Sequence, residues 1–369
     1  MCYIAIGSVD QLIDPTDQND EGEILGMVTP ASSPSPAMNA QQILNMNYAF
    51  AQTAMLIAAI RLHLFTALAE KPSSTRELAG PMHMDPQALE RLLQGLQTLQ
   101  LVFQEGEVYR LTPLADRFLV EGKASYLGGD TLAMLDYIPA WFQLDKTLQT
   151  GIPYRDLGDV SIAEDFFAPR VRDLFQVIYP VAYRTATELK LPQSNDTPLH
   201  ILDVGAGSAP WSIAFAQCYP SSHVTALDLP RVVEQGQQQT SRLGLQDRYT
   251  WISQSMETFE FSSHSYDLII IAHVLRFIEE QRAIQLLHRA VGSLRPHGTL
   301  IIADVFLAED RQGPESAIAL NISMLVNTKQ GAIRGWHEIA NWLTSCGLQH
   351  VQSFHVAGPF PIVFGQKES

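Results

Sequence analysis

The chain has 369 residues, of which 46% are hydrophobic and 17% charged, and its formal net charge is −15. This composition predicts a folded chain with room for two domains and excludes disorder of the whole chain. The acidic balance disfavours binding to nucleic acid or to an anionic membrane surface. Three scattered cysteines, Cys2, Cys218 and Cys346, predict neither a disulfide framework nor a metal site. We therefore expect a cytoplasmic protein without a membrane span or a secretory leader.

The first third of the chain predicts a tail and a mainly helical domain. Residues 1–38 contain an acidic stretch and the linker-like TPASSPSP, which predicts a mobile tail. Residues 39–122 begin with a helix that is apolar nearly all round, typical of a buried or partner-facing helix. A helix capped by Asp85 and a hairpin around Glu105-Gly106 follow, which together indicate a winged-helix domain. Because its would-be recognition helix carries few basic residues, dimerisation is a better interpretation than DNA binding.

Residues 123–192 predict helices that link this domain to the rest and line a substrate pocket, because large aromatic side chains gather there. Residues 193–369 alternate apolar strands with helices, which predicts an α/β sandwich of about seven strands. The expected strands cover 199–204, 223–228, 249–252, 266–272 and 299–305, with a closing antiparallel pair at 348–357 and 360–365. The expected helices cover 211–218, 231–243, 279–294 and 336–346, and Pro296-His297-Gly298 is interpreted as the stop of the third.

The stretch LHILDVGAGSAPW indicates a nucleotide site. Gly205 and Gly207 follow a buried strand at once, where the backbone must come close to something. The next strand ends on Asp228, whose two oxygens suit the hydroxyls of a ribose. Asp203 precedes the first glycine and would repel a pyrophosphate but attract a cation. S-adenosylmethionine, with a ribose, an ammonium and a sulfonium, fits such a site.

Several motifs in order carry a resemblance to a known family. LDVGAGSA, ALDLP and RPHGTLIIAD, preceded by LFTALAEKPSSTRELA, DPQALERLLQGLQTLQLV and YRLTPLAD, resemble the small-molecule O-methyltransferases with an N-terminal winged-helix dimerisation domain. That group includes plant phenolic, hydroxyindole and bacterial natural-product enzymes. The resemblance runs from about residue 42 to the C-terminus. It implies a class I methyltransferase fold that binds S-adenosylmethionine and releases S-adenosylhomocysteine. It also implies a homodimer formed through the N-terminal domain and a small organic molecule as the methyl acceptor.

The resemblance also implies which residues contact the cofactor. Asp203, Gly205 and Gly207 would frame the methionine part, and Asp228 would bind the ribose. The adenine would lie against Leu229, Ser255 and Met256, with Ser255 in place of the aspartate that is common in the family.

One departure concerns the general base. In HVLRFIEEQ, Arg276 stands where the family has a histidine base, and arginine stays protonated in proteins. Three hypotheses follow: Arg276 orients an acceptor that is already an anion, another residue is the base, or the acceptor atom is carbon. His273 is the first candidate for another base, ahead of Tyr137 and Tyr179, although a structural role suits it better.

The substrate-facing helix of the family matches SAIALNISMLVNTKQG, so Asn321, Met324 and Asn327 are candidate acceptor contacts. Met324 suits a core position equally well. Trp141 and Phe142 would form the opposite wall. We expect methyl transfer to a small, aromatic, natural-product-like acceptor. The alternative is a relative that binds the same cofactor but catalyses a pericyclic or decarboxylating step.

Overall fold

The computed structural model describes residues 40–189, 191, 198–356 and 358–368. The expected N-terminal tail lies outside the described residues. The described chain forms two compact units that meet in sequence between Leu132 and Ala133. This division comes later than the domain boundary predicted at residue 122, and each unit is described below by itself.

The first unit packs short helices against a two-stranded sheet. Its elements are α1 (Ala40–Arg61), α2 (Leu64–Glu70), α3 (Thr75–Ala79), α4 (Pro86–Thr98), β1 (Val102–Glu105), β2 (Val108–Leu111) and α5 (Pro113–Leu119), with α6 (Gly128–Ala133) at the division. The strands pair antiparallel as predicted. The long apolar helix is interrupted at His63, whose φ of 52° is left-handed, so the chain turns and Leu64 and Phe65 enter the core.

Helix α1 is buried only at its C-terminal end. Ile57, Ala59 and Ile60 are at most 5% exposed. Apolar side chains near its start are between 48% and 70% exposed, namely Ile43, Leu44, Met46, Tyr48 and Phe50. By length and composition alone, Gln42–Arg61 is long and apolar enough to cross a membrane, a test that core helices of soluble proteins also pass.

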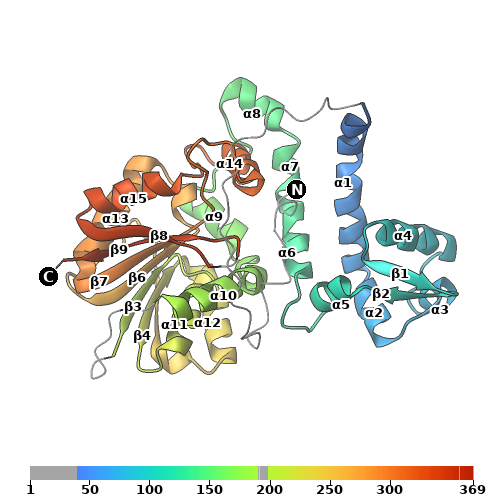
Figure 1. Cartoon of the computed structure of the whole chain (residues 1–369), viewed down its shortest axis with the longest axis horizontal. Helices are drawn as coiled ribbons and strands as arrows, with labels where there is room; N and C mark the ends of the chain where they lie inside the picture. Colours follow the sequence, from blue (N-terminus) through green and yellow to red (C-terminus); the bar gives the residue numbers. More distant parts are fainter. Residues whose placement is uncertain (1–39, 190, 192–197, 357, 369) are drawn as a thin grey trace, which may run out of the picture. The chain divides into compact units, whose positions relative to one another are not determined.

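The second unit begins with helices and continues into a seven-stranded sheet (Figure 1). The helices before the sheet are α7 (Ile138–Trp141), α8 (Leu144–Thr150), α9 (Val160–Phe167) and α10 (Val171–Glu188). The strands are β3 (His200–Val204), β4 (His223–Asp228), β5 (Tyr249–Ser253), β6 (Tyr266–Ala272), β7 (Leu294–Ala303), β8 (Leu348–Phe354) and β9 (Ile362–Lys367). Between the strands lie α11 (Pro210–Cys218), α12 (Pro230–Arg242), α13 (Glu280–Ser293), α14 (Glu315–Asn327) and α15 (Trp336–Ser345), and the short 3-10 helices η3 (Gln246–Arg248) and η4 (Leu275–Phe277). A further 3-10 helix, η2 (Met134–Asp136), precedes α7.

The strands lie in the order β5-β4-β3-β6-β7-β9-β8. The first five are parallel, and β9 is antiparallel to both of its neighbours. The strand order reverses direction between β3 and β6. In an open α/β sheet this is the position where a ligand binds, outside the carboxyl ends of the strands. The fold class predicted from the sequence, a Rossmann-like sheet preceded by a helical dimerisation domain, is confirmed.

Alternate side chains of β6 enter two separate cores. Leu268 and Ile270 pack with α10 and α11, whereas Ile269 and Ile271 pack with α13 and α15. All four are fully buried, because helices cover both faces of the sheet (Figure 1). This explains why the strand is apolar throughout instead of alternating.

The predicted helix stop at Pro296-His297-Gly298 is wrong, because these residues lie inside β7. The pairing with β6 starts at Tyr266 and Leu294 and shifts register before Leu268. A Cβ at Gly298 would lie 2.9 Å from the Arg295 carbonyl oxygen, so the irregularity requires glycine. Helix α13 ends at Ser293, one residue before the end predicted for it, and β7 follows at once.

Candidate active site

The glycine turn after β3 is held by backbone bonds. The amide of Gly205 donates to the carbonyl of Leu227 at 2.8 Å, and Gly205 and Gly207 have φ values of 70° and 60°. A Cβ at Gly205 would lie 2.4 Å from the Cγ2 of Val274, so this glycine permits the close approach of a side chain from beyond β6. A Cβ at Gly207 would meet only an ordinary contact, 3.6 Å from Val171.

Asp228 lies at the carboxyl end of β4 beside this turn. Its Oδ2 accepts from the amide of Gly207 at 2.7 Å, and its Oδ1 accepts from the amide of Leu229 at 2.7 Å. Burial raises the pKa of Asp228 to about 6, against the lowering effect of these two bonds. The carboxylate is half-buried, and Leu229 packs beside it with Val171 and Val232.

Asp203 is buried beneath the same turn, with 2% of its surface exposed. Burial raises its pKa to about 7, while hydrogen bonds with Ser212 lower it and the charge of Asp228 raises it further. Its Oδ2 has no hydrogen-bond partner among the described residues. Two carboxyl groups with raised pKa values therefore lie at one end of the sheet.

The turn after β5 places Ser255 and Met256 next to β4. The amide of Gln254 donates to the carbonyl of Asp228 at 3.0 Å, which ties the start of the turn to the aspartate. Both Ser255 and Met256 are half-buried, and Met256 packs against the core beneath α13. The structure thus brings all seven predicted cofactor residues to the carboxyl ends of β3, β4 and β5.

The ends of β6 and β7 bring three charged or ionisable side chains together. Arg276 Nη1 donates to Asp304 Oδ1 at 2.9 Å, and the two side chains are only 15% and 8% exposed. His273 Nδ1 lies 3.8 Å from the same Asp304 oxygen. Asp304 also accepts from the amide of Val305 at 2.8 Å. Although burial acts in the opposite direction, the Arg276 guanidinium and His273 lower the pKa of Asp304.

His273 is enclosed by the core of the unit. Its Nε2 lies 3.4 Å from the indole Nε1 of Trp211, and the ring of Phe360 meets it edge-on at 4.6 Å. Burial lowers its pKa, so the neutral imidazole is favoured. The indole N–H can only donate, so His273 Nε2 is the acceptor and Nδ1 carries the proton.

Apart from Tyr179 in α10, the predicted acceptor contacts lie within or directly beside α7 and α14, two helices that contact each other. Met324 is 1% exposed and packs with Leu307 and Ile333, as a core residue does. Asn321 Oδ1 accepts from the amide of Ile333 at 2.9 Å. Asn327 is fully buried, donates to the Ser323 carbonyl at 2.9 Å, and leaves its Oδ1 without a partner among the described residues.

The aromatic candidates are spread more widely. Tyr137 meets the ring of Phe166 edge-on at 5.0 Å, Trp141 is half-buried at the end of α7, and Phe142 is 76% exposed. The hydroxyl of Tyr179 hydrogen-bonds to Gln217 at the C-terminal end of α11. Because α11 begins at the glycine turn and runs back along the sheet, the structure does not bring Tyr179 to the ends of the parallel strands.

Asp304 has no predicted role in the sequence, although a signal was present. The run TLIIAD is an apolar strand that ends on an acid, the same pattern that identified Asp228. Arg289, which contacts the turn after β5, gave no such signal because it lies within an ordinary amphipathic helix.

The donor set fits S-adenosylmethionine. The carboxylate of Asp228 offers acceptors for ribose hydroxyls, and the unpartnered Oδ2 of buried Asp203 suits a cationic ligand. The turn at Gly205 has the left-handed backbone expected where a strand leads into such a site. Fold and site together define the class of S-adenosylmethionine-dependent methyltransferases.

Comparison with known proteins identifies the family. The O-methyltransferase dimerisation domain matches residues 44–121, and the O-methyltransferase domain matches residues 188–349. The chain belongs to the family of O-methyltransferases that combine these two domains, and its methyl donor is S-adenosylmethionine.

Two bacterial relatives match over most of their length. The tetracenomycin polyketide synthesis 8-O-methyl transferase of Streptomyces glaucescens is 26% identical over 335 residues, which cover 88% of this chain and 96% of that protein. The 3-hydroxy-5-methyl-1-naphthoate 3-O-methyltransferase of Streptomyces sahachiroi is 25% identical over 309 residues, 84% of this chain and 89% of that protein. The solved structure of human N-acetylserotonin methyltransferase in complex with S-adenosylmethionine has a TM-score of 0.78, at 22% identity, and covers 91% of this chain and all of that one.

Proposed function

We propose that this O-methyltransferase acts on an oxygen that is already ionised or loses its proton without a protein base, and that Arg276 orients that oxygen. The single observation that carries the proposal is the ion pair between Arg276 and Asp304, at the position where the resemblance puts a histidine base. The acceptor is an acidic phenol, an enolate or a carboxylate on a small aromatic, natural-product-like molecule.

Each neighbouring group is a poor base for a phenol. Arginine stays protonated in proteins and does not accept a proton from a phenol. Asp304 has a lowered pKa, so it has little tendency to take a proton from a weaker acid. His273 is neutral, but its Nε2 faces the Trp211 indole and its protonated Nδ1 faces Asp304, so both ring nitrogens are turned to protein groups.

Arg276 retains donors after pairing with Asp304. Its Nη1 is engaged, whereas its Nε has no partner among the described residues. A charge-assisted hydrogen bond from a guanidinium to an acceptor oxygen is shorter and stronger than a neutral one. Because Asp304 neutralises the charge of the Arg276 guanidinium, Arg276 would orient the acceptor oxygen through a directional hydrogen bond and would not attract it from a distance. The fixed fork of donors suits that role.

Aromatic rings adjoin this ion pair and support an aromatic acceptor. The guanidinium carbon of Arg276 lies 5.4 Å from the ring centre of Phe277, which meets Phe167 at 5.1 Å. The relative from Streptomyces sahachiroi is named for methylation of a hydroxyl on a naphthoate, an aromatic that also carries a carboxylate. An acceptor of this kind combines a flat apolar body with an anionic group.

The bound cofactor supplies a methyl group on a positively charged sulfur, which the acceptor oxygen takes with its own electron pair while S-adenosylhomocysteine leaves. No proton needs to move in that step when the oxygen is ionised beforehand. The residues of the chain then contribute mainly by alignment, since an in-line approach at short range supplies much of such a rate. Asp228 and the turn with Ser255 and Met256 would hold the cofactor, and Arg276 would hold the acceptor.

The proposal is tested by the pH dependence of kcat/KM with a series of phenols of graded acidity. Without a protein base, the rate should rise with pH up to the pKa of each phenol and follow that pKa through the series. A single inflection at the same pH for every phenol would indicate a protein base and would contradict the proposal. In parallel, Arg276→Met should lower kcat/KM for the acceptor at least about tenfold while calorimetry shows an unchanged Kd for S-adenosylmethionine.

We further propose that the chain acts as a homodimer through its dimerisation domain. The support is the exposed apolar start of α1, with Tyr48 70% and Phe50 64% exposed. So many exposed large apolar side chains in one short stretch of helix are rare on a soluble monomer and are typical of a segment that a second subunit covers.

A further inference from the structure

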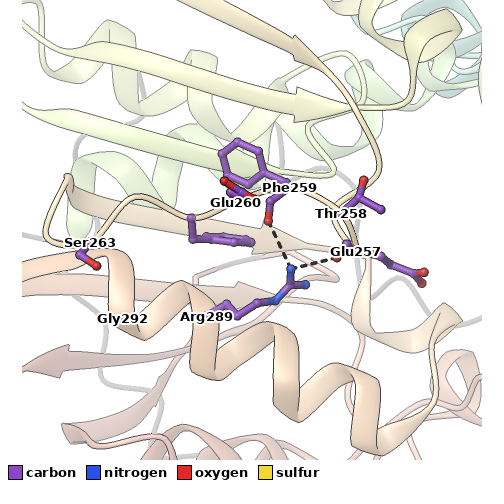
Figure 2. Close-up of a pocket in the computed structure, with 8 residues that line it drawn as sticks. Glu257, Thr258, Phe259, Glu260, Ser263, Arg289 and Gly292 are labelled. Atoms are coloured by element: carbon purple, nitrogen blue, oxygen red, sulfur yellow. Dashed lines mark hydrogen bonds between the residues drawn. The ribbon is translucent and has the colours of Figure 1, made fainter.

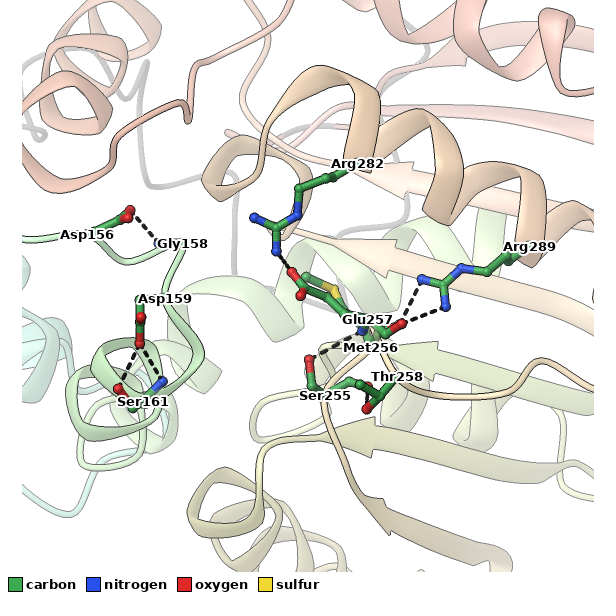
Figure 3. A network of polar contacts seen from close by, with 10 residues as sticks. All are labelled: Asp156, Gly158, Asp159, Ser161, Ser255, Met256, Glu257, Thr258, Arg282 and Arg289. Atoms are coloured by element: carbon green, nitrogen blue, oxygen red, sulfur yellow. Dashed lines mark hydrogen bonds and ion pairs between the residues drawn. The ribbon is translucent and has the colours of Figure 1, made fainter.

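The turn that follows β5 is attached to α13 by two arginines (Figure 3). Arg289 Nη2 donates to the carbonyl of Met256 at 2.9 Å, and its Nη1 donates to the carbonyls of Glu257 at 3.0 Å and Phe259 at 3.3 Å. Arg282, on the same helix, forms an ion pair with the carboxylate of Glu257. One guanidinium thus binds three carbonyl groups, those of Met256, Glu257 and Phe259, within the turn.

The rest of the turn is closed by its own short-range bonds. The amides of Thr258 and Phe259 both donate to the carbonyl of Ser255 at 3.1 Å, and the amide of Glu257 donates to the Ser255 hydroxyl at 3.3 Å. These bonds set the shape of the turn but do not attach it to the sheet or the helices. Attachment comes from Gln254 on the β4 side and, on the α13 side, from Arg289 to the backbone and from Arg282 to the Glu257 side chain.

The surroundings of Arg289 favour a positioning role over a general stabilising one. Its guanidinium carbon lies 5.1 Å from the ring centre of Phe261, and burial lowers its pKa. A cavity of about 460 Å³ lies beside it, lined by residues 257–261 (Figure 2). Because this cavity admits water, removal of the guanidinium would leave the carbonyl groups hydrated, and the turn would loosen without collapse of the core.

We propose that Arg289 is a positioning residue that sets how well the protein binds the adenine of its cofactor. This inference rests on the proposed contact of Ser255 and Met256 with the adenine, because Arg289 acts on the cofactor only through that turn. A loosened turn lowers the affinity for the whole cofactor and lowers the discrimination between adenine and an altered base. The methyl-transfer step itself is unaffected once the cofactor is bound.

The test compares Arg289→Lys with Arg248→Lys. Arg248 is a matched control because its guanidinium also binds carbonyl groups, those of Ala216 at 2.6 Å, Tyr219 at 2.8 Å and Ser222 at 3.1 Å, but beside the amino ends of β4 and β5, whereas the turn follows the carboxyl end of β5. Lysine keeps the charge in both variants but cannot reproduce the planar fork of donors.

Calorimetry with S-adenosylhomocysteine and with its deaminated, inosine-containing analogue is the main measurement. We expect Arg289→Lys to weaken S-adenosylhomocysteine about five- to tenfold, as expected for the loss of hydrogen bonds to a charged group, and to weaken the analogue less. At saturating cofactor its kcat should equal that of the wild type. Arg248→Lys should lower the melting temperature and leave both Kd values unchanged.

Two results would overturn the inference, and a third would be a failure of a different kind. In the first, the wild type and Arg289→Lys bind S-adenosylhomocysteine with equal Kd values. In the second, Arg248→Lys weakens both ligands as much as Arg289→Lys does. Either result would show that Arg289 has only a structural role. If the wild type bound S-adenosylhomocysteine and its inosine-containing analogue with equal affinity, the placement of the adenine at Ser255 and Met256 would be wrong. That would be a failure of the proposed function itself.

Discussion

Arg276 and Asp304 are separated by 27 residues in the sequence, yet Nη1 of the arginine lies 2.9 Å from Oδ1 of the aspartate. The pairing of β6 with β7 explains this contact. Ala272 is the register partner of Ala303, so the residues that follow each strand emerge side by side. His273 donates its amide to the carbonyl of Ala303 at 2.8 Å and extends the ladder by one bond.

The ion pair should show strong energetic coupling. Arg276→Met or Asp304→Asn alone leaves one buried charge unpaired, and each should lower the free energy of unfolding by about 3 kcal/mol. The double variant leaves no unpaired charge and should cost less than the sum of the two single variants. Urea unfolding of all four proteins measures this cycle. Additivity within about 0.5 kcal/mol would mean that the two residues do not interact.

The two glycines of the turn should respond differently to alanine. Gly207→Ala adds only the left-handed strain, about 1–2 kcal/mol. Gly205→Ala adds the same strain and also a contact of 2.4 Å with Val274, so it should destabilise the protein more. Val274→Ala in the Gly205→Ala background should then remove the excess. Denaturant unfolding measures these free energies. The explanation would be wrong if Val274→Ala destabilised the Gly205→Ala variant as much as it destabilises the wild type.

Cofactor affinity should increase with pH. The pKa of Asp203 is raised to about 7 and that of Asp228 to about 6, whereas a cationic ligand favours their ionised forms. The Kd for S-adenosylmethionine should therefore fall between about pH 5.5 and about pH 8, with release of protons on binding. Titration calorimetry in buffers of different ionisation enthalpy detects that release. S-adenosylhomocysteine, which lacks the sulfonium charge, should show a smaller change.

The raised pKa of Asp203 should make the protein without cofactor less stable as pH rises. Folded Asp203 holds its proton more tightly than unfolded Asp203, whose pKa is near 3.8. Its contribution to the free energy of unfolding is therefore fully present below about pH 4 and is lost as pH rises towards about 7. Asp203→Asn should remove this slope. An identical pH dependence in the wild type and in Asp203→Asn would argue against a raised pKa at this position.

Charge on the exposed N-terminal part of α1 should separate the dimer. Tyr48→Asp and Phe50→Asp place carboxylates on an apolar surface that we propose is covered by a second subunit. Light scattering should report a monomer for both variants. Leu243→Asp, at a residue 42% exposed after α12, is the control and should remain dimeric. Dimeric Phe50→Asp would place the interface elsewhere.

The sequence by itself determined the segments whose structure depends on near neighbours. The apolar run of β3, the paired glycines, Pro210 at the start of α11 and the acid that ends β4 are local signals, and they predicted the strand, turn, helix and strand correctly. Helical spacing and capping residues likewise predicted α4, where Asp85 accepts from the amide of Ala88 at 2.8 Å.

Only the tertiary structure decided which side chains meet. The contacts of Asp304 with Arg276, of Val274 with Gly205, and of Arg289 with the Met256 carbonyl all depend on which strands are neighbours and on their register. Those choices follow from burial across the whole sheet, a sum over many residues that no short pattern encodes. The start of β7 at Leu294 was missed for the same reason, because Pro296 and Gly298 favour a turn locally and the pairing with Tyr266 outweighs that preference.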